Sequence, residues 1–194
     1  MREAEQAPPG ARLPQIGCRS RHDAKVTNWP DPTDPGNDAR RLVLVRHAKA
    51  VSSSDVSDRS RPLTDRGRAD AGTGGGWLDW RVQLIDAIWS SSALRAQQTT
   101  EEIRARLTSA PEPRLRDDLY DAGPDDLLDI IRSAPDDIRT LVVVGHNPTI
   151  EVLSARLTGD DRGFRAAAMA IIEFDNDWVG LSPGGGRLVD FVEP

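Results

Sequence analysis

Three short apolar runs, separated by stretches of helical pattern, constrain the fold of this chain more than any other feature. The runs are RLVLV at 41–45, IDAIWS at 85–90 and TLVVVG at 140–145. They are rich in β-branched residues, which is typical of strands covered on both faces of a sheet. Apolar residues recur at helical spacing in three further stretches, 93–107, 124–134 and 148–159. This alternation predicts parallel strands joined by crossover helices.

Two more strands are predicted near the end of the chain, at 168–174 and 187–192. With them, the pattern predicts an α/β fold, a three-layer α/β/α sandwich around a mostly parallel central sheet. A stretch at 71–80, AGTGGGWLDW, falls where a helix should join the first two strands. Because each glycine disfavours helix by about 1 kcal/mol relative to alanine, we interpret it as a frayed or interrupted helix anchored by Trp77, Leu78 and Trp80.

Composition narrows the classes of partner. The formal net charge is −6, which argues against nucleic acid and anionic membranes, since both select broad basic surfaces. No apolar run approaches the roughly 18 residues of a membrane span. The single cysteine, Cys18, excludes an internal disulfide framework, and the charged, proline-rich start lacks the apolar core of a secretory signal. A cytoplasmic protein is expected.

The first 39 residues differ from the rest. They are rich in proline, as in NWPDPTDPGND, and show almost no apolar periodicity. Such a segment buries too little apolar surface to offset its ordering entropy. We therefore expect a disordered or loosely docked extension at 1–39 and one domain at 40–194.

Cationic and titratable side chains follow three of the predicted strands. Arg46 and His47 come directly after the first run, and His146 follows TLVVVG. Arg95 lies in the first turn of the helix after the second run, where free backbone N–H groups favour an anion. Because ligands bind at the carboxyl ends of parallel strands, these four side chains should meet at one edge, with Lys49 close by. A dianionic phosphate suits such a cluster.

Four motifs in this order resemble the histidine phosphatase superfamily, and within it the SixA-type phosphohistidine phosphatases. They are LVLVRHAKA, RPLTDRGRADA, SSALRAQQT and VVVGHNPTIEVL. The resemblance covers about residues 40–194 and leaves the extension out. It implies a compact phosphoglycerate-mutase-like domain without the large insertion that encloses small metabolites in some relatives.

The resemblance also implies roles for the clustered residues. His47 would attack phosphorus and form a transient phosphohistidine, while Arg46, Arg95 and His146 would hold the phosphoryl oxygens. Substrate or phosphate contacts are expected from the side chains of Lys49 and Arg61 and from the backbone of Asn147. No metal and no other cofactor are expected.

The general acid is less clearly marked. Relatives usually carry a glutamate after the second motif, whereas RLRDDLYDAG at 114–123 offers aspartates. Asp117 is the first candidate, with Asp118 and Asp121 as alternatives, and the site lacks an acid if none serves. A phosphoramidate has a readily protonated leaving nitrogen and needs less help than an alkyl phosphate.

The leading hypothesis is therefore a metal-independent phosphohydrolase acting on phosphohistidine in a signalling or phosphotransfer protein. Two alternatives stay open, a small-molecule or nucleotide phosphomonoesterase of the same fold, and a phosphate-binding domain without catalysis. About fifty residues separate Arg95 from His146, which predicts an open site that admits a side chain of a folded protein.

Overall fold

The computed structural model describes residues 39–52 and 55–194. The predicted extension at 1–39 lies outside these residues except for its last position. Six strands form one sheet in the order β3-β2-β4-β1-β5-β6. The strands are β1 (Arg40–Arg46), β2 (Ala87–Ser91), β3 (Arg114–Arg116), β4 (Thr140–Gly145), β5 (Met169–Phe174) and β6 (Arg187–Val192).

The sheet is mostly parallel, as predicted. Strand β4 lies parallel between β1 and β2, and β3 extends this parallel part at the edge. Strand β5 runs antiparallel to β1, and β6 runs antiparallel to β5. The edge strand β3 was not predicted; it pairs with β2 directly before the 3-10 turn Asp117–Leu119.

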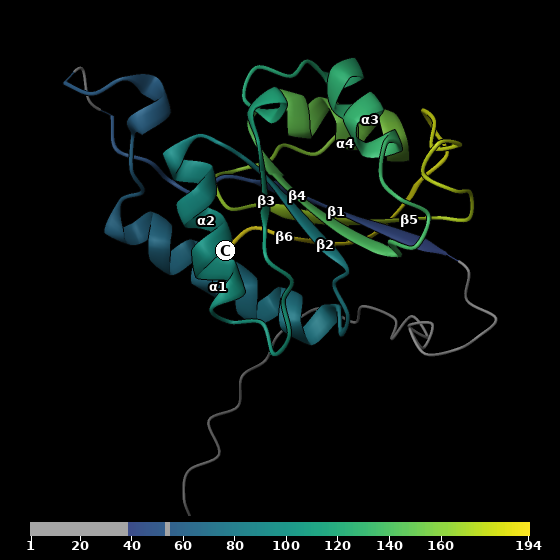
Figure 1. The fold of residues 1–194 in the computed structure, drawn as a ribbon, viewed down its shortest axis with the longest axis horizontal. Helices are drawn as coiled ribbons and strands as arrows, with labels where there is room; N and C mark the ends of the chain where they lie inside the picture. Colours follow the sequence, from purple (N-terminus) through teal and green to yellow (C-terminus); the bar gives the residue numbers. More distant parts are fainter. Residues whose placement is uncertain (1–38, 53–54) are drawn as a thin grey trace, which may run out of the picture. The chain divides into compact units, whose positions relative to one another are not determined.

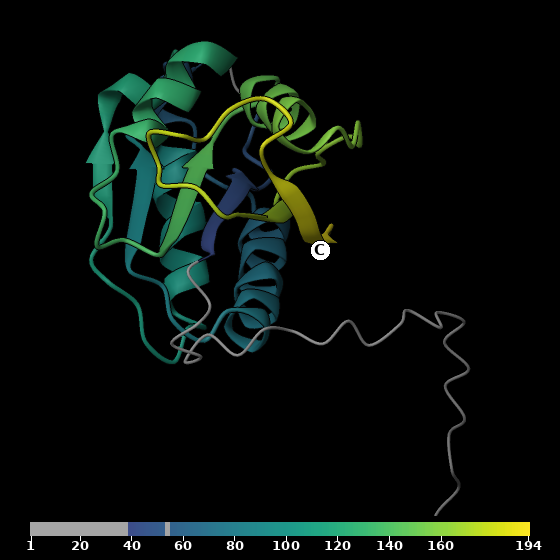
Figure 2. The ribbon, with the colours of Figure 1, turned by 90° about the vertical axis from the view of Figure 1, so that its right-hand side faces the viewer.

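Helices cover both faces of the sheet (Figure 1, Figure 2). The four helices are α1 (Asp65–Arg81), α2 (Leu94–Arg104), α3 (Pro124–Arg132) and α4 (Thr149–Thr158). Helices α1 and α2 pack together on one face, and α3 and α4 pack together on the other. Two short 3-10 segments, Asp58–Ser60 and Asp117–Leu119, complete the regular structure. The predicted α/β/α sandwich is confirmed.

The two-sided burial of β1 explains its unbroken apolar sequence. Leu42 and Leu44 belong to the core cluster that includes residues of α3 and α4, such as Leu127 and Leu153. The alternate residue Val43 is buried as completely. Because successive side chains of a strand point to opposite faces, both faces of β1 must be apolar, which removes the polar alternation of a half-exposed strand.

The interrupted helix expected at 71–80 is wrong, because α1 runs without a break from Asp65 to Arg81. One of its glycines, Gly75, allows a close contact with the neighbouring helix. A methyl group at Gly75 would lie 2.8 Å from the Cα atom of Ile103 on α2, so a larger residue would push the helices apart. Leu78 is fully buried, but Trp80 is 74% exposed and anchors nothing.

Candidate active site

The first and second predicted histidines lie side by side at the carboxyl edge of the sheet. Arg46 of β1 pairs in register with Gly145 of β4, so the residues that follow, His47 and His146, leave neighbouring strands together. The backbone N–H of His47 donates to the Gly145 carbonyl at 3.0 Å. The two imidazole rings lie 5.1 Å apart between centroids.

The ring of His47 is held in one orientation. Its Nδ1 lies 2.8 Å from the carbonyl oxygen of Ala48, an acceptor, so Nδ1 carries the proton and donates it. Its Nε2 therefore has a free lone pair, and the Nε–H of Arg95 donates to that nitrogen at 3.2 Å. Both contacts indicate the same tautomer, in which Nε2 is the ring nitrogen that could act as a nucleophile.

Arg95 links the two histidines. It is buried at the start of α2, and its Nη2 lies 3.4 Å from Nδ1 of His146. The other ring nitrogen of His146, Nε2, lies 2.8 Å from the hydroxyl oxygen of Ser91 at the end of β2. Ser91 also accepts from the backbone N–H of Ala93 at 3.3 Å. The end of β2 therefore fixes both the arginine and the second histidine.

The environment keeps both histidines neutral. Burial, together with the charges of Arg95 and Arg46, lowers the pKa of His47 to about 4 against the opposing effect of the Ala48 carbonyl. Burial, then the neighbouring His47 and Arg95, lower the pKa of His146 to about 3. Neutral imidazole is the form in which His47 can attack an electrophile.

A carboxylate that the sequence reasoning missed lies among the same groups. Asp58 accepts hydrogen bonds from Arg95 Nη2 at 2.9 Å and from the Tyr120 hydroxyl at 2.7 Å. Arg61 donates to its other oxygen at 2.9 Å, which brings this predicted residue into the cluster. The Tyr120 hydroxyl, with Arg61 and Arg95, holds the pKa of Asp58 well below its usual range. The carboxylate occupies donors that an oxyanion would use.

Tyr120, also missed, forms a wall of the site. Its ring meets the His146 ring edge-on, with centroids 5.6 Å apart, and Arg59 lies over the ring at 4.8 Å. The hydrogen bond to Asp58 raises the pKa of the Tyr120 hydroxyl. Neither Asp58 nor Tyr120 follows a core strand, so the pattern that identified the histidines gave no signal for them.

Arg46 and Asn147 meet at a backbone carbonyl beside the histidines. Arg46 Nη1 donates to the carbonyl oxygen of Phe164 at 2.5 Å. The side-chain Nδ2 of Asn147 donates to the same oxygen at 3.1 Å and to Glu151 at 2.8 Å. Lys49 lies apart, because its side chain is exposed and its carbonyl accepts from Thr64 at the start of α1.

Comparison with known proteins identifies the family. A sequence model described as "Histidine phosphatase superfamily (branch 1)" matches residues 42–123. An uncharacterized protein of Mycobacterium tuberculosis is 33% identical over 162 residues, which are 77% of this chain and 99% of that protein. The chain belongs to the histidine phosphatase superfamily.

Two further relatives place this histidine phosphatase in the SixA-type group. A structure assigned to phosphohistidine phosphatase SixA from Nakamurella multipartitia is 32% identical, with a TM-score of 0.73, and covers 80% of this chain and 96% of its own. Phosphohistidine phosphatase SixA of Escherichia coli is 26% identical over 139 residues, 70% of this chain and 86% of that protein.

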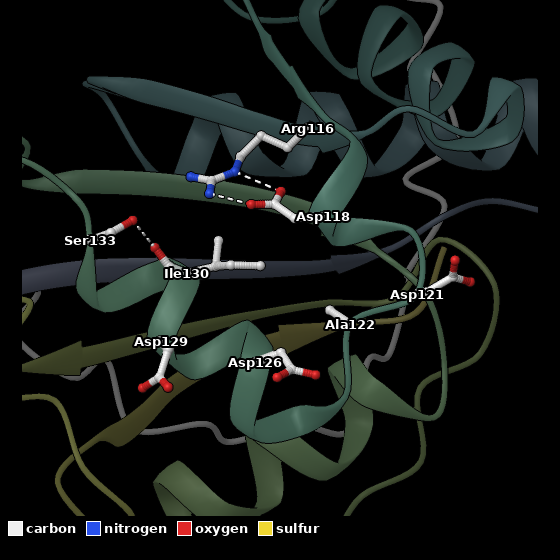
Figure 3. Close-up of a pocket in the computed structure, with 8 residues that line it drawn as sticks. All are labelled: Arg116, Asp118, Asp121, Ala122, Asp126, Asp129, Ile130 and Ser133. Carbon is white, nitrogen blue, oxygen red and sulfur yellow. Dashed lines mark hydrogen bonds and ion pairs between the residues drawn. The ribbon is translucent and has the colours of Figure 1, made fainter.

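Of the three aspartates expected near the site of this phosphatase, Asp117 lies at its rim, and Asp118 and Asp121 line a separate pocket. The carboxylate of Asp117 is turned to Arg59 and to the Ser92 hydroxyl, which donates at 2.6 Å. Asp118 pairs with Arg116 at 2.9 and 2.5 Å, in an open pocket of about 550 Å³ beside α3 (Figure 3). Asp121 lines the same pocket and points away from that pair. Asp58, rather than these, contacts Arg95, which lies beside both histidines.

The described residues hold neither a metal-binding cluster nor a membrane-spanning helix. Within residues 39–52 and 55–194, no three His, Cys, Asp or Glu side chains gather as a bound metal ion would need. No helix in this part of the histidine phosphatase is long and apolar enough to cross a membrane.

Proposed function

We propose that this protein removes the phosphoryl group from phosphohistidine on a signalling or phosphotransfer protein. The observation that carries the proposal is the Nε2 atom of His47, unprotonated, fixed by the Ala48 carbonyl and facing Arg95. In the first step Nε2 forms a bond to phosphorus while the bond from phosphorus to the substrate imidazole breaks. In the second step water attacks phosphorus, the bond to His47 breaks, and inorganic phosphate leaves.

The cations around His47 supply the electrostatic part of this proposal. Arg95 and Arg46 would bind the phosphoryl oxygens, and Arg61 would complete the positive wall. His146 would donate a further hydrogen bond after taking up a proton, because a bound dianion opposes the burial and the cationic charges that keep this imidazole neutral in the free protein. A loose phosphoryl-transfer transition state spreads charge over these oxygens, so fixed donors lower the barrier. No step requires a metal ion, and metal-independent turnover is part of the proposal.

We assign the proton on the leaving group to Asp58, ahead of the sequence-based candidate Asp117. Asp58 accepts from Arg95, which itself contacts His47, whereas Asp117 is held by Arg59 and Ser92 at the rim. When a phosphoryl dianion competes for the donors of Arg95 and Arg61, the carboxylate loses two of the contacts that keep its pKa low. The negative charge of the dianion raises that pKa further, which lets Asp58 bring a proton to the leaving nitrogen.

Two observations favour a phosphohistidine protein over a small phosphate ester. The relatives from Nakamurella multipartitia and Escherichia coli carry the name phosphohistidine phosphatase. Between α2 and β4 the chain holds only β3, a 3-10 turn and the nine-residue α3, so no inserted subdomain encloses the site. An open site admits an imidazole on a folded partner.

The test compares substrates in the presence of EDTA. Purified protein is incubated with a phosphohistidine-labelled phosphotransfer protein and, separately, with a panel of nucleotide and sugar phosphates, and released phosphate is measured. Turnover of the phosphoprotein is expected. Turnover of esters alone would favour the phosphomonoesterase, and binding without release would favour a non-catalytic domain.

The variant His47→Ala tests the covalent mechanism. It should abolish both turnover and the acid-labile phosphorylation of the enzyme while leaving the circular dichroism spectrum unchanged. Retained turnover in this variant contradicts the covalent mechanism, whatever the substrate.

The same proposal includes the domain organisation of the chain and its location in the cell. Residues 40–194 form the phosphatase domain, and residues 1–39 are an extension to it. A cytoplasmic location fits the single cysteine of the chain, because that compartment keeps thiols reduced.

A further inference from the structure

A glutamate on α4 ties together the groups beside Arg46. Glu151 lies in the first turn of that helix. Its Oε2 atom accepts two hydrogen bonds, from the side-chain Nδ2 of Asn147 at 2.8 Å and from the backbone N–H of Phe164 at 3.0 Å. One carboxylate oxygen therefore joins the residue after His146 to the segment between α4 and β5.

The same segment holds the guanidinium of Arg46. The Phe164 carbonyl accepts from Arg46 Nη1 at 2.5 Å and from Asn147 Nδ2 at 3.1 Å. The Nε atom of Arg46 is buried and has no hydrogen-bond partner within the described residues. The position of the Phe164 carbonyl thus decides where the arginine fork points.

We propose that Glu151 is a positioning residue that aims Arg46 at the phosphoryl oxygens by fixing the Phe164 backbone. The inference rests on the proposed function, because it takes Arg46 as a phosphoryl ligand. The chain of contacts is short: the Glu151 carboxylate holds the Phe164 N–H, and the carbonyl of the same residue holds the guanidinium. Displacing this carbonyl by about 1 Å would misalign an arginine that must meet two oxygens at once.

Two substitutions of Glu151 separate the effect of side-chain length from the effect of charge. Glu151→Gln keeps the side-chain length and an oxygen that can accept both hydrogen bonds, but it removes the charge. Glu151→Asp keeps the charge but is one methylene too short to reach both donors. Positioning through hydrogen bonds therefore predicts that the glutamine variant resembles the wild type and that the aspartate variant does not.

The probe is tungstate, a tetrahedral oxyanion with the shape of phosphate, titrated into the full-length protein by calorimetry. Wild type and Glu151→Gln should bind with dissociation constants within threefold of each other, and Glu151→Asp should bind about tenfold more weakly. With phosphorylated substrate, the aspartate variant should raise KM more than it lowers kcat. In an Arg46→Met background, Glu151→Asp should change tungstate binding by less than twofold.

The control is Glu101→Asp, a substitution at an exposed position on α2, and this variant should bind tungstate as the wild type does. Equal binding by wild type and Glu151→Asp overturns the inference but leaves the proposed function standing, as does a loss of binding in Glu151→Gln that matches the aspartate variant. Failure of the wild type itself to bind tungstate overturns the phosphoryl site and the inference with it.

Discussion

At the scale of the residue, Asp58 is the group whose state changes most during the proposed reaction. In the free protein its carboxylate accepts from Tyr120, Arg61 and Arg95, although more than half of the side chain is exposed. A phosphoryl group must compete for the same donors. Its arrival therefore raises the proton affinity of Asp58 at the moment when the leaving group needs a proton.

Replacing Asp58 with asparagine tests this role, with Asp117→Asn as the matched control. Asp58→Asn should lower kcat about 100-fold for an alkyl phosphate, since general acid catalysis contributes about 10²–10⁴-fold. The loss should be smaller for phosphohistidine, whose leaving nitrogen is protonated more easily. Asp117→Asn should stay within about threefold for both substrates.

Steady-state kinetics with both substrates give the answer. Equal losses of kcat in the two asparagine variants, or a loss in Asp117→Asn alone, would contradict the assignment of Asp58 and favour Asp117 as the proton donor. Tungstate binding by Asp58→Asn provides a check on the site, because removal of the competing carboxylate should tighten binding.

The difference between the residues found from sequence and those missed has a physical reason. Arg46, His47 and His146 follow core strands, and Arg95 follows a strand by a few residues, so sheet geometry alone predicts where they meet. Asp58 reaches the site through its contacts with Arg95, 37 residues along the chain, and with Tyr120, 62 residues along the chain. No periodic pattern in its segment predicts such a contact.

At the scale of the element, α1 shows how packing overrides helix propensity. The glycine run reduces intrinsic helix stability, yet the helix continues through it because small residues allow the backbone of α2 to approach. The strands, in contrast, were predicted correctly where both faces are buried, since their apolar sequences have no competing interpretation. Helix propensity describes the preference of a residue in a solvent-exposed helix, whereas one face of α1 is packed against other elements.

Two neighbouring glycines of α1 provide a matched test. Gly75→Ala should lower the free energy of unfolding by about 1–3 kcal/mol, because the added methyl group overlaps the Ile103 backbone. Gly76→Ala meets nothing within 4 Å and should raise it by up to about 1 kcal/mol through helix propensity alone. Urea unfolding of both variants measures these changes. A stabilising Gly75→Ala would contradict the close-packed interface.

At the scale of the whole molecule, the partly buried, neutral histidines link the active site to acid stability. The pKa values of His47 and His146 in the folded protein, about 4 and about 3, lie below the ordinary value of 6.5. Above pH 6.5 both are neutral whether the chain is folded or unfolded. As the pH falls below that value, the unfolded chain binds protons that the folded chain refuses, so stability decreases.

The free energy of unfolding should therefore drop between pH 7 and pH 5, by about 2 kcal/mol for each of the two histidines. Urea unfolding at pH 7, 6 and 5 measures the drop. In His146→Asn it should be about half as large, since one of the two groups is gone. A stability that is constant over this range would show that the imidazoles are not shielded as the structure places them.

The antiparallel direction of β5 has a consequence for how the substrate range of this protein can change. A parallel strand beside β1 would start at the far edge of the sheet, but β5 starts at the catalytic edge, so the segment leading into it borders Arg46. That segment, which carries Phe164, joins a helix to a strand and contributes no strand to the sheet. The outward side chains of this segment are thus free to vary during evolution, whereas the Phe164 backbone stays fixed because it holds Arg46. Divergence among relatives in what they dephosphorylate should be concentrated there.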